Sequence, residues 1–297
     1  MVARRVSSSP SSQARWIVLP PFRHDAAWRA AVASAAAEAG LRLHDLDADP
    51  QNAPLGDAKA VILTADAQQP LAAGVPAEAL AGLIAGPGMH LDGDEAPDAI
   101  PPHIAVYTDL MGRTDLLPAH RLFRSRDFAS GAVEIFPGLK LHRPTIAPSR
   151  PLSPRLQAVT EAVALLDPAS PKAVWAPDLF NYDSRIVPGG TRGQLDLTGR
   201  PRFMITGPYI TMPPGRWRAT YRLTFDAKGS RPRFRVDWGG QTDYLSEEFV
   251  PGRAGVFEIV QDYVWTERSV CELRVVVLEG VFDGRMTFSG AEIERIG

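Results

Sequence analysis

GPYITMPPGRWRATYRLTF (residues 207–225) places a proline–glycine turn between two strand-like segments. Proline presets φ at the first central position of a tight turn, and Gly215 is able to take the left-handed position that follows. After the turn, apolar and polar residues alternate with a period of two, which predicts a strand with one buried and one solvent- or ligand-facing side. The residues expected to be buried are Trp217, Ala219, Tyr221, Leu223 and Phe225. Those expected on the other face are Arg216, Arg218, Thr220, Arg222 and Thr224.

Short strand candidates continue from residue 175 to the end of the chain, with turn residues between them. They are SRIVP, GQLDLTG, FMITGPYITMP, WRATYRLTFDA, PRFRVDWGG, GVFEIVQDYVW, CELRVVVLEG and MTFSGAEIERI. About eight short strands at this spacing indicate a sandwich or jelly roll. The sequence therefore predicts an all-β, β-sandwich (jelly-roll) domain over residues 175–297.

The strand–turn–strand motif resembles that of carbohydrate-binding and galactose-binding-like jelly-roll domains, in which GPY…LPxGxYxxxxxL begins the core hairpin. The matching residues are Gly207, Pro208, Tyr209, Pro214, Gly215, Trp217 and Leu223. The resemblance covers about 120 residues and implies a sandwich fold and, by association, saccharide binding. Such domains also occur attached to bacterial proteins of polysaccharide biosynthesis, which are the partners that the resemblance implies.

Saccharide sites combine a flat aromatic ring with planar polar side chains, and three groups of residues fit this description. The first group is Trp238 and Tyr244 with Asp237, Gln241 and Asp243, in VDWGGQTDYLSEEF. The second group is Tyr263, Trp265 and Glu267, and the third is Trp175, Asp178 and Tyr182. Sandwich cores are themselves rich in Trp and Tyr, so each ring has an alternative place in the core, and Trp217 is expected there.

The first half of the chain has the alternating strand and helix pattern of an α/β domain. WIVLPPF, LRLHDLD and AKAVILTAD read as strands, and AAWRAAVASAAAEAG as a helix that ends at Gly40. Weaker patterns suggest a helix over 76–86, a strand over 103–110 and a hairpin over 131–144. These elements predict a small Rossmann-like parallel-sheet domain over residues 16–144.

A nucleotide-sugar site is the alternative to a saccharide-binding sandwich. Arg23 and His24 follow the first strand and precede a helix, where an anion is able to bind. Asp109, near Arg113, is expected at a strand end of the same sheet. PPFRHDAAW lacks both G-x-G-x-x-G and a P-loop lysine. A glycosyltransferase-like enzyme using a nucleotide sugar at these residues is therefore kept as a second hypothesis.

Residues 1–15 read as a disordered tail, and residues 145–174 as a proline-rich linker that contains one amphipathic helix over 153–167. The net charge of −2 gives no electrostatic case for nucleic acid or for an anionic membrane. No secretion signal or membrane span is recognised, so a cytoplasmic location is expected. The single cysteine, Cys271, excludes an intramolecular disulfide and is expected to be buried. No cofactor or metal is expected, since the run HLDGDE (residues 90–95) has the composition of an exposed loop.

These observations favour glycan recognition, with the C-terminal sandwich binding a saccharide or a partner enzyme in bacterial surface-polysaccharide or glycoconjugate metabolism. A purely structural adaptor remains a third hypothesis. The sequence leaves open which sugar is bound, whether the α/β domain is catalytic, and the oligomeric state.

Overall fold

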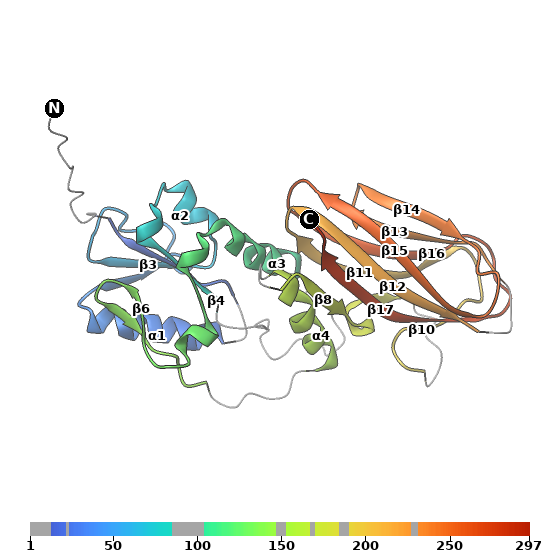
Figure 1. The fold of residues 1–297 in the computed structure, drawn as a ribbon, viewed down its shortest axis with the longest axis horizontal. Helices are drawn as coiled ribbons and strands as arrows, with labels where there is room; N and C mark the ends of the chain where they lie inside the picture. Colours follow the sequence, from blue (N-terminus) through green and yellow to red (C-terminus); the bar gives the residue numbers. More distant parts are fainter. Residues whose placement is uncertain are drawn as a thin grey trace. The chain divides into compact units, whose positions relative to one another are not determined.

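The computed structural model describes residues 13–21, 24–84, 104–146, 153–166, 170–183, 190–226 and 231–297. Two compact units make up the chain (Figure 1). One comprises Met1–Gly86 and Arg113–Pro148, and the other comprises Pro87–Gly112 and Ser149–Gly297. The predicted combination of a parallel α/β sheet and a β-sandwich is confirmed. The candidates SRIVP and HLDGDE lie outside the described residues.

The α/β unit is built on a five-stranded parallel sheet in the order β2-β3-β1-β4-β5. Its strands are β1 Arg15–Val18, β2 Arg42–Asp45, β3 Ala60–Thr64, β4 Leu80–Ile84 and β5 Leu122–Arg124. Helix α1, Asp25–Glu38, ends before Gly40. The φ of Gly40 is 67°, a left-handed conformation that glycine adopts more easily than residues with a Cβ. The three strands and the helix predicted most clearly from the sequence are confirmed.

Apolar layers cover both faces of this sheet. Helix α1 and the hairpin of β6, Val133–Phe136, and β7, Leu139–Leu141, share one core with the sheet. Ala67 and Val75, which flank the short helix α2, Gln68–Ala72, belong to a second core that forms on the opposite face. The hairpin predicted over 131–144 is confirmed.

The helix predicted over 76–86 is wrong. The segment forms a short 3-10 turn, Ala77–Ala79, followed by β4. Strand β4 lies between β1 and β5, and four of its five residues are buried. Burial between two neighbouring strands and two apolar layers overrides the helix propensity of alanine and leucine here.

The strand predicted over 103–110 is also wrong, because this segment forms helix α3, Ile104–Gly112. Ile104, Tyr107 and Thr108 are buried at the three- and four-residue spacing of a helix. The Thr108 hydroxyl donates to the Ile104 carbonyl at 2.7 Å. Although α3 precedes the last part of the α/β unit in sequence, it belongs to the sandwich unit.

Two antiparallel sheets form the sandwich. The first contains β10 Gln194–Asp196, β17 Arg285–Arg295, β12 Gly215–Phe225 and β15 Gly255–Trp265, with β8 Lys172–Trp175 also paired to β17. The second has the order β14 Tyr244–Phe249, β13 Phe234–Gly240, β16 Ser269–Val277, β11 Arg202–Met212 and β9 Asn181–Tyr182. Strands β8, β9 and β14 were not predicted as separate strands from the sequence.

The turn before β12 and the alternation within it are confirmed. Gly215 has a φ of 143°, which a residue with a side chain rarely adopts. The predicted inward residues, Trp217 to Phe225 in steps of two, are buried. Trp217 is a core residue, and its indole N–H donates to the Pro213 carbonyl at 3.2 Å.

Helices α3 and α4, Pro154–Ala162, contribute residues to the sandwich core. Ser153 caps α4 by accepting a hydrogen bond from the Leu156 amide at 3.3 Å. The hydroxyl of Thr211, on β11, donates to the Ala105 carbonyl at 2.7 Å. Cys271 is buried as predicted, and burial raises the pKa of its thiol well above the usual value.

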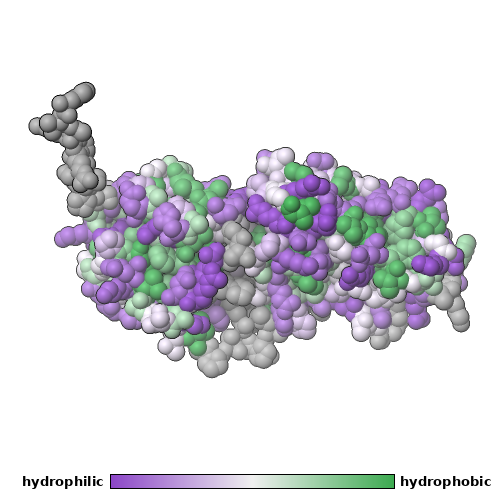
Figure 2. Space-filling model, viewed as in Figure 1, coloured by the Kyte–Doolittle hydropathy of each residue, from purple (hydrophilic) through white to green (hydrophobic). Residues whose placement is uncertain are grey.

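The outer face of the first sheet alternates charged and apolar side chains. Val256, Val260 and Val264 on β15 are exposed, and Glu258 and Asp262 stand between them. Figure 2 shows hydrophobic residues interspersed with hydrophilic ones on the visible face of the molecule. In the described parts of the chain, no helix has the length and apolar character needed to cross a membrane.

Candidate functional site

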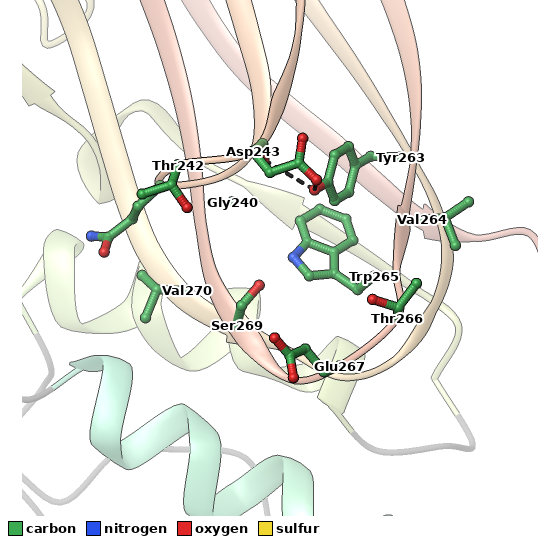
Figure 3. A pocket seen from close by; sticks show the side chains of 11 residues that line it. Gly240, Thr242, Asp243, Tyr263, Val264, Trp265, Thr266, Glu267, Ser269 and Val270 are labelled. Atoms are coloured by element: carbon green, nitrogen blue, oxygen red, sulfur yellow. Dashed lines mark hydrogen bonds between the residues drawn. The ribbon is translucent and has the colours of Figure 1, made fainter.

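A pocket of about 320 Å³ lies in the sandwich unit where two turns come together (Figure 3). One turn joins β13 to β14, and the other joins β15 to β16. The two turns are neighbours because Gly240, at the end of β13, pairs with Cys271 near the start of β16. The pocket is lined by Gly240, Gln241, Thr242, Asp243, Tyr263, Val264, Trp265, Thr266, Glu267, Ser269 and Val270.

Gly239 makes the first turn possible. Its φ is 150°, and a Cβ placed on it would lie 2.7 Å from the Tyr244 Cα and 2.8 Å from the Tyr263 ring. Any side chain here would force the backbone apart. The Gly240 amide then donates to the Asp243 carbonyl at 2.7 Å, which closes the turn. This tight closure sets where Asp243 stands at the pocket edge.

A hydrogen bond from Tyr263 joins the two sides of the pocket. The phenol oxygen lies 3.0 Å from the Asp243 carbonyl oxygen and 3.1 Å from Oδ2 of its carboxylate. Burial and the hydrogen bond to Asp243 raise the pKa of Tyr263 above its ordinary value. The phenol is therefore neutral near neutral pH and acts as a donor that orients Asp243.

Trp265 forms the inner wall of the pocket. Only 3% of its surface is exposed, and its ring packs edge-on against Tyr263 at 4.5 Å and Trp238 at 5.2 Å between centroids. Its indole Nε1 has no hydrogen-bond partner among the described residues. Figure 3 shows this nitrogen on the side of the ring that faces Ser269 and Val270, inside the space that the lining residues enclose. A buried N–H left unpaired costs about 1–3 kcal/mol. The indole nitrogens of Trp28, Trp175 and Trp238 are likewise unpaired among the described residues, but of these four rings only Trp265 lines the pocket, where a ligand oxygen that reaches its N–H would gain a hydrogen bond.

The remaining polar groups of the pocket are two carboxylates, three hydroxyls and one amide. Asp243 and Glu267 stand on opposite sides of Trp265 in Figure 3. Arg274, on β16, donates from its Nη2 to the Gln241 carbonyl at 3.0 Å and to Glu272 at 2.5 Å. Arg274 itself is not a lining residue. The polar side chains among the described lining residues are all neutral or acidic.

The structure divides the first predicted group of sugar-binding residues. Gln241 and Asp243 line the pocket, whereas Asp237, Trp238 and Tyr244 do not. The half-buried ring of Tyr244 lies beneath the Arg274 guanidinium, 4.7 Å from its centroid, so that face of the ring is occupied.

The structure does not place Trp238 and Asp237 for a direct sugar contact at this pocket. Trp238 is fully buried and packs against Trp175 and Trp265, so its ring offers no face to a ligand. Asp237 is almost fully buried, accepts a hydrogen bond from Ser246 at 2.6 Å, and pairs with Arg235. Successive side chains of β13 point to opposite faces of the sheet. Trp238 lies on the face that is directed into the core, even though turn residues follow it in the sequence.

The second predicted group lies together at the pocket, since Tyr263, Trp265 and Glu267 all line it. The third group does not reach it. Trp175 is fully buried, and the hydroxyl of Tyr182 donates to the Pro177 carbonyl at 2.7 Å. Burial raises the pKa of Tyr182 above its usual value, as expected for a structural phenol.

Sequence reasoning missed Thr242, Thr266 and Ser269, which also line the pocket. These residues lie in or beside the segments QTD and TERS that follow two strands, and their small polar character was the available signal. What the sequence did not show is that these two turns are spatial neighbours, because that depends on the order of strands in the sheet.

The residues predicted for a nucleotide-sugar site are not assembled in the described structure. Arg23 lies outside the described residues, and His24 directly precedes α1. Asp109 lies in helix α3 of the sandwich unit, so its predicted place at a strand end of the parallel sheet is wrong. Arg113 pairs with Asp66 at 2.6 Å.

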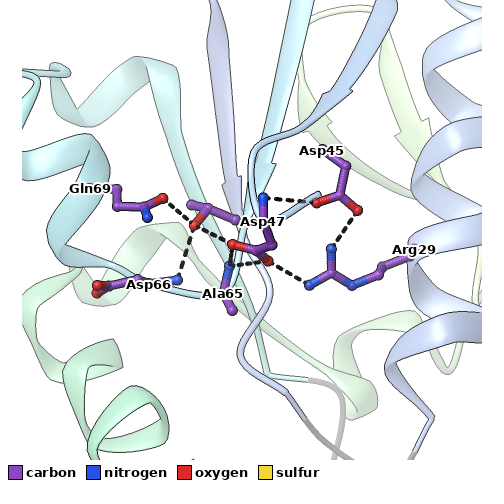
Figure 4. Close-up of polar contacts among 7 residues, drawn as sticks. Arg29, Asp45, Asp47, Ala65, Asp66 and Gln69 are labelled. Carbon is purple, nitrogen blue, oxygen red and sulfur yellow. Dashed lines mark hydrogen bonds and ion pairs between the residues drawn. The ribbon is translucent and has the colours of Figure 1, made fainter. Parts of the chain in front are cut away.

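A polar network does occupy the carboxyl end of the parallel sheet (Figure 4). Arg29 of α1 binds Asp45 and Asp47, each at 2.7 Å. Asp47 also accepts hydrogen bonds from the Ala65 amide at 2.9 Å and from the Thr64 hydroxyl at 3.1 Å. These bonds tie α1, β2 and β3 together, which is a structural role. Within the described residues, no group of three or more His, Cys, Asp or Glu residues is placed to hold a metal ion.

No protein-family model matches the chain, and no significantly similar curated protein was found. Solved structures similar to it include a family 61 carbohydrate-binding module in complex with β-1,4-galactotriose, at 12% identity and a TM-score of 0.29, covering 43% of this chain and 90% of that one. A family 16 carbohydrate-binding module has 11% identity and a TM-score of 0.26, with 43% and 87% covered. A family 36 module of a xylanase from the hindgut metagenome of Trinervitermes trinervoides has 16% identity and a TM-score of 0.26, with 35% and 78% covered. Because these TM-scores are low, the similarities carry no argument about the site, and the β-sandwich rests on the strand pairing described above.

Proposed function

We propose that the protein recognises a saccharide at the pocket formed by the β13–β14 and β15–β16 turns. The observation that carries this proposal is the buried indole N–H of Trp265, which lacks a partner among the described residues and faces a pocket rimmed with polar groups. An unpaired buried donor at such a place favours a ligand that brings an acceptor oxygen.

The chemistry of the lining suits sugar hydroxyls. Gln241 offers a planar amide, Asp243 and Glu267 accept hydrogen bonds, and Thr242 and Ser269 both donate and accept. A sugar hydroxyl also both donates and accepts, so it complements all of these groups. A pocket of about 320 Å³ lies at the small end of the range for ligand sites, which suits a short saccharide or the end of a chain.

The cellular setting is proposed from the motif between Gly207 and Leu223. Its resemblance to jelly-roll domains of bacterial polysaccharide-biosynthesis proteins supports a proposed role in cytoplasmic surface-polysaccharide or glycoconjugate metabolism, with a saccharide or a biosynthetic protein as partner. We do not extend the proposal to a nucleotide-sugar transferase, because Asp109 and His24 lie in different units. A blank glycan array together with specific capture of a protein would support the adaptor hypothesis instead.

A thermal-shift screen of the full chain against free saccharides and nucleotide sugars tests saccharide recognition. A ligand at 100 times its Kd adds about 2.7 kcal/mol to the stability of the protein, which is readily measured. We expect stabilisation by at least one free saccharide, and we expect Gln241→Ala and Ser269→Ala to reduce it. Stabilisation by nucleotide sugars alone, unaffected by these two variants, would contradict the proposal.

A further inference from the structure

The charges of the pocket point to a narrower ligand class than saccharides in general. Resting on the proposed function, we propose that the pocket selects sugar units that carry a free amino group over their N-acetylated, neutral and acidic counterparts. The ligand would place its ammonium group between Asp243 and Glu267, and a hydroxyl or ring oxygen at Nε1 of Trp265.

Asp243 is held ready for such a group. The Tyr263 hydroxyl binds Oδ2 of its carboxylate, and the Gly240 amide binds its main-chain carbonyl. Both bonds fix the residue at the pocket edge, and Oδ1 takes part in neither of them. The side chain of Asp243 is also exposed, so its charge is accessible to a ligand in the pocket.

Glu267 supplies the second negative charge from the opposite turn. It is exposed, and it forms no ion pair with any described residue. Figure 3 places it on the far side of Trp265 from Asp243, with Ser269 and Thr266 nearby. An ammonium group between the two carboxylates would interact favourably with both, whereas a uronic acid would be repelled by both.

Four arginines near the pocket in sequence or by strand pairing are directed elsewhere. Arg274 is bound to Glu272, and Arg216 and Arg218 both pair with Asp262. Arg268 follows Glu267 directly, but its guanidinium lies beside Gly112 of α3, within 2.9 Å of where a Cβ on that glycine would stand. None of these four guanidinium groups belongs to the described lining of the pocket, so the two carboxylates are not neutralised there.

The Trp265 N–H separates an amino sugar from other cations. Its indole is 3% exposed and unpartnered among the described residues, so a ligand that brings a hydrogen-bond acceptor as well as a positive charge complements both features of the pocket. A metal ion or a simple amine brings no acceptor oxygen of its own to this N–H. An amino sugar carries the ammonium group and several acceptor oxygens on one ring.

Isothermal titration calorimetry on the full chain tests the selectivity. The probes are glucosamine, galactosamine and mannosamine, each beside its N-acetylated form and its neutral parent sugar (glucose, galactose or mannose), together with glucuronate and galacturonate. Measured at about pH 6, where amines are protonated, at least one amino sugar is expected to bind roughly fivefold or more tightly than its N-acetylated form. This preference should shrink as salt is added, because exposed charges are screened.

Two charge-removing variants locate the effect. Asp243→Asn and Glu267→Gln should each weaken amino-sugar binding by roughly three- to tenfold, and should weaken N-acetyl-sugar binding less. Glu258→Gln is the matched control, because it removes one exposed carboxylate on β15 that pairs with Arg222 outside the pocket. It should leave both affinities unchanged.

The possible results distinguish this inference from the proposed function. If neutral, acetylated or acidic sugars bind as well as amino sugars do, amine selectivity is wrong while saccharide recognition stands. The same conclusion follows if amino sugars bind and the two pocket variants behave like Glu258→Gln. If no saccharide in the panel binds but the thermal-shift screen finds another saccharide that does, amine selectivity is wrong while saccharide recognition stands. If neither experiment finds a saccharide, both the selectivity and the proposed function are overturned.

Discussion

The phenol of Tyr263 lies within hydrogen-bonding distance of two oxygens of Asp243, the main-chain carbonyl at 3.0 Å and Oδ2 at 3.1 Å. This contact links the end of β15 to the turn between β13 and β14, and so joins the two sides of the pocket. The same hydrogen bond therefore stabilises this end of the sandwich and holds the Asp243 carboxylate in position at the proposed site.

Removing this hydroxyl should therefore affect both stability and binding. We expect Tyr263→Phe to lower the free energy of unfolding by about 0.5–1.5 kcal/mol, the usual net value of one hydrogen bond. Saccharide affinity should fall as well, because Asp243 is no longer oriented. Tyr244→Phe is the matched control, since no hydrogen bond of the Tyr244 hydroxyl is seen within the described part of the chain. Urea denaturation of both variants checks the prediction, and equal stabilities would contradict it.

Gly239 should tolerate no side chain. In Gly239→Ala the new Cβ meets the Tyr244 backbone at 2.7 Å, and the φ of 150° is unfavourable for alanine. We expect a loss of about 2 kcal/mol or more. Gly252→Ala is the control, because no atom lies within 4 Å of its Cβ position and its φ lies outside the left-handed range. A Gly239→Ala protein as stable as Gly252→Ala would show that the turn is formed differently.

Thr108 is one of the residues that attach α3 to the sandwich. Its hydroxyl accepts a hydrogen bond from the buried amide of Thr211 at 2.8 Å. Thr108→Val keeps the side-chain shape but leaves that amide unpaired, so we expect a loss of about 1–3 kcal/mol. Thr160→Val on α4 removes a hydroxyl that, among the described residues, bonds to the Leu156 carbonyl of its own helix, and should cost less. Thermal denaturation compares the two, and a smaller loss for Thr108→Val would argue against this attachment.

Asp262 should make stability depend on acidity. A hydrogen bond from Arg218, reinforced by the charges of Arg218 and Arg216, holds the pKa of Asp262 below its ordinary value. A lowered folded-state pKa means that this contribution is present above the unfolded-state pKa, near 3.9, and is lost as pH falls through the folded-state value. Asp262→Asn should therefore be less stable than the native protein at neutral pH, by up to about 1 kcal/mol for so exposed a pair. The two should converge below about pH 4. A difference that does not change between neutral and acid pH would contradict this.

Local sequence patterns predicted much of the fold because the responsible forces are local. The turn at Gly215 and the alternation of β12 follow from backbone freedom and a period of two. The helical pattern of α1 and the buried strands β1 and β3 were equally clear. Segments whose structure depends on distant partners were predicted incorrectly. Strand β4 is a strand because β1 and β5 flank it, and α3 is a helix packed on the sandwich.

In the candidate site, too, local sequence predicted the residue types, whereas their arrangement depends on distant strands. Gln241, Asp243, Tyr263, Trp265 and Glu267 were recognised as polar and aromatic residues near turns, but as members of two separate groups. Their convergence depends on the pairing of β13 with β16, which no local pattern reveals. Trp238 was mistaken for a ligand contact because turn residues follow it, although the alternation along β13 directs it inward.

The most direct test of saccharide binding at this pocket is the indole N–H resonance of Trp265 in a proton–nitrogen correlation spectrum, assigned with Trp265→Phe. When a stabilising saccharide is added, this resonance should shift and become more slowly exchanging, because its unpaired donor gains an acceptor. The Trp217 indole, already bonded to the Pro213 carbonyl at 3.2 Å, is an internal control that should not move. A saccharide that binds the protein but leaves the Trp265 resonance unchanged would contradict the proposed site.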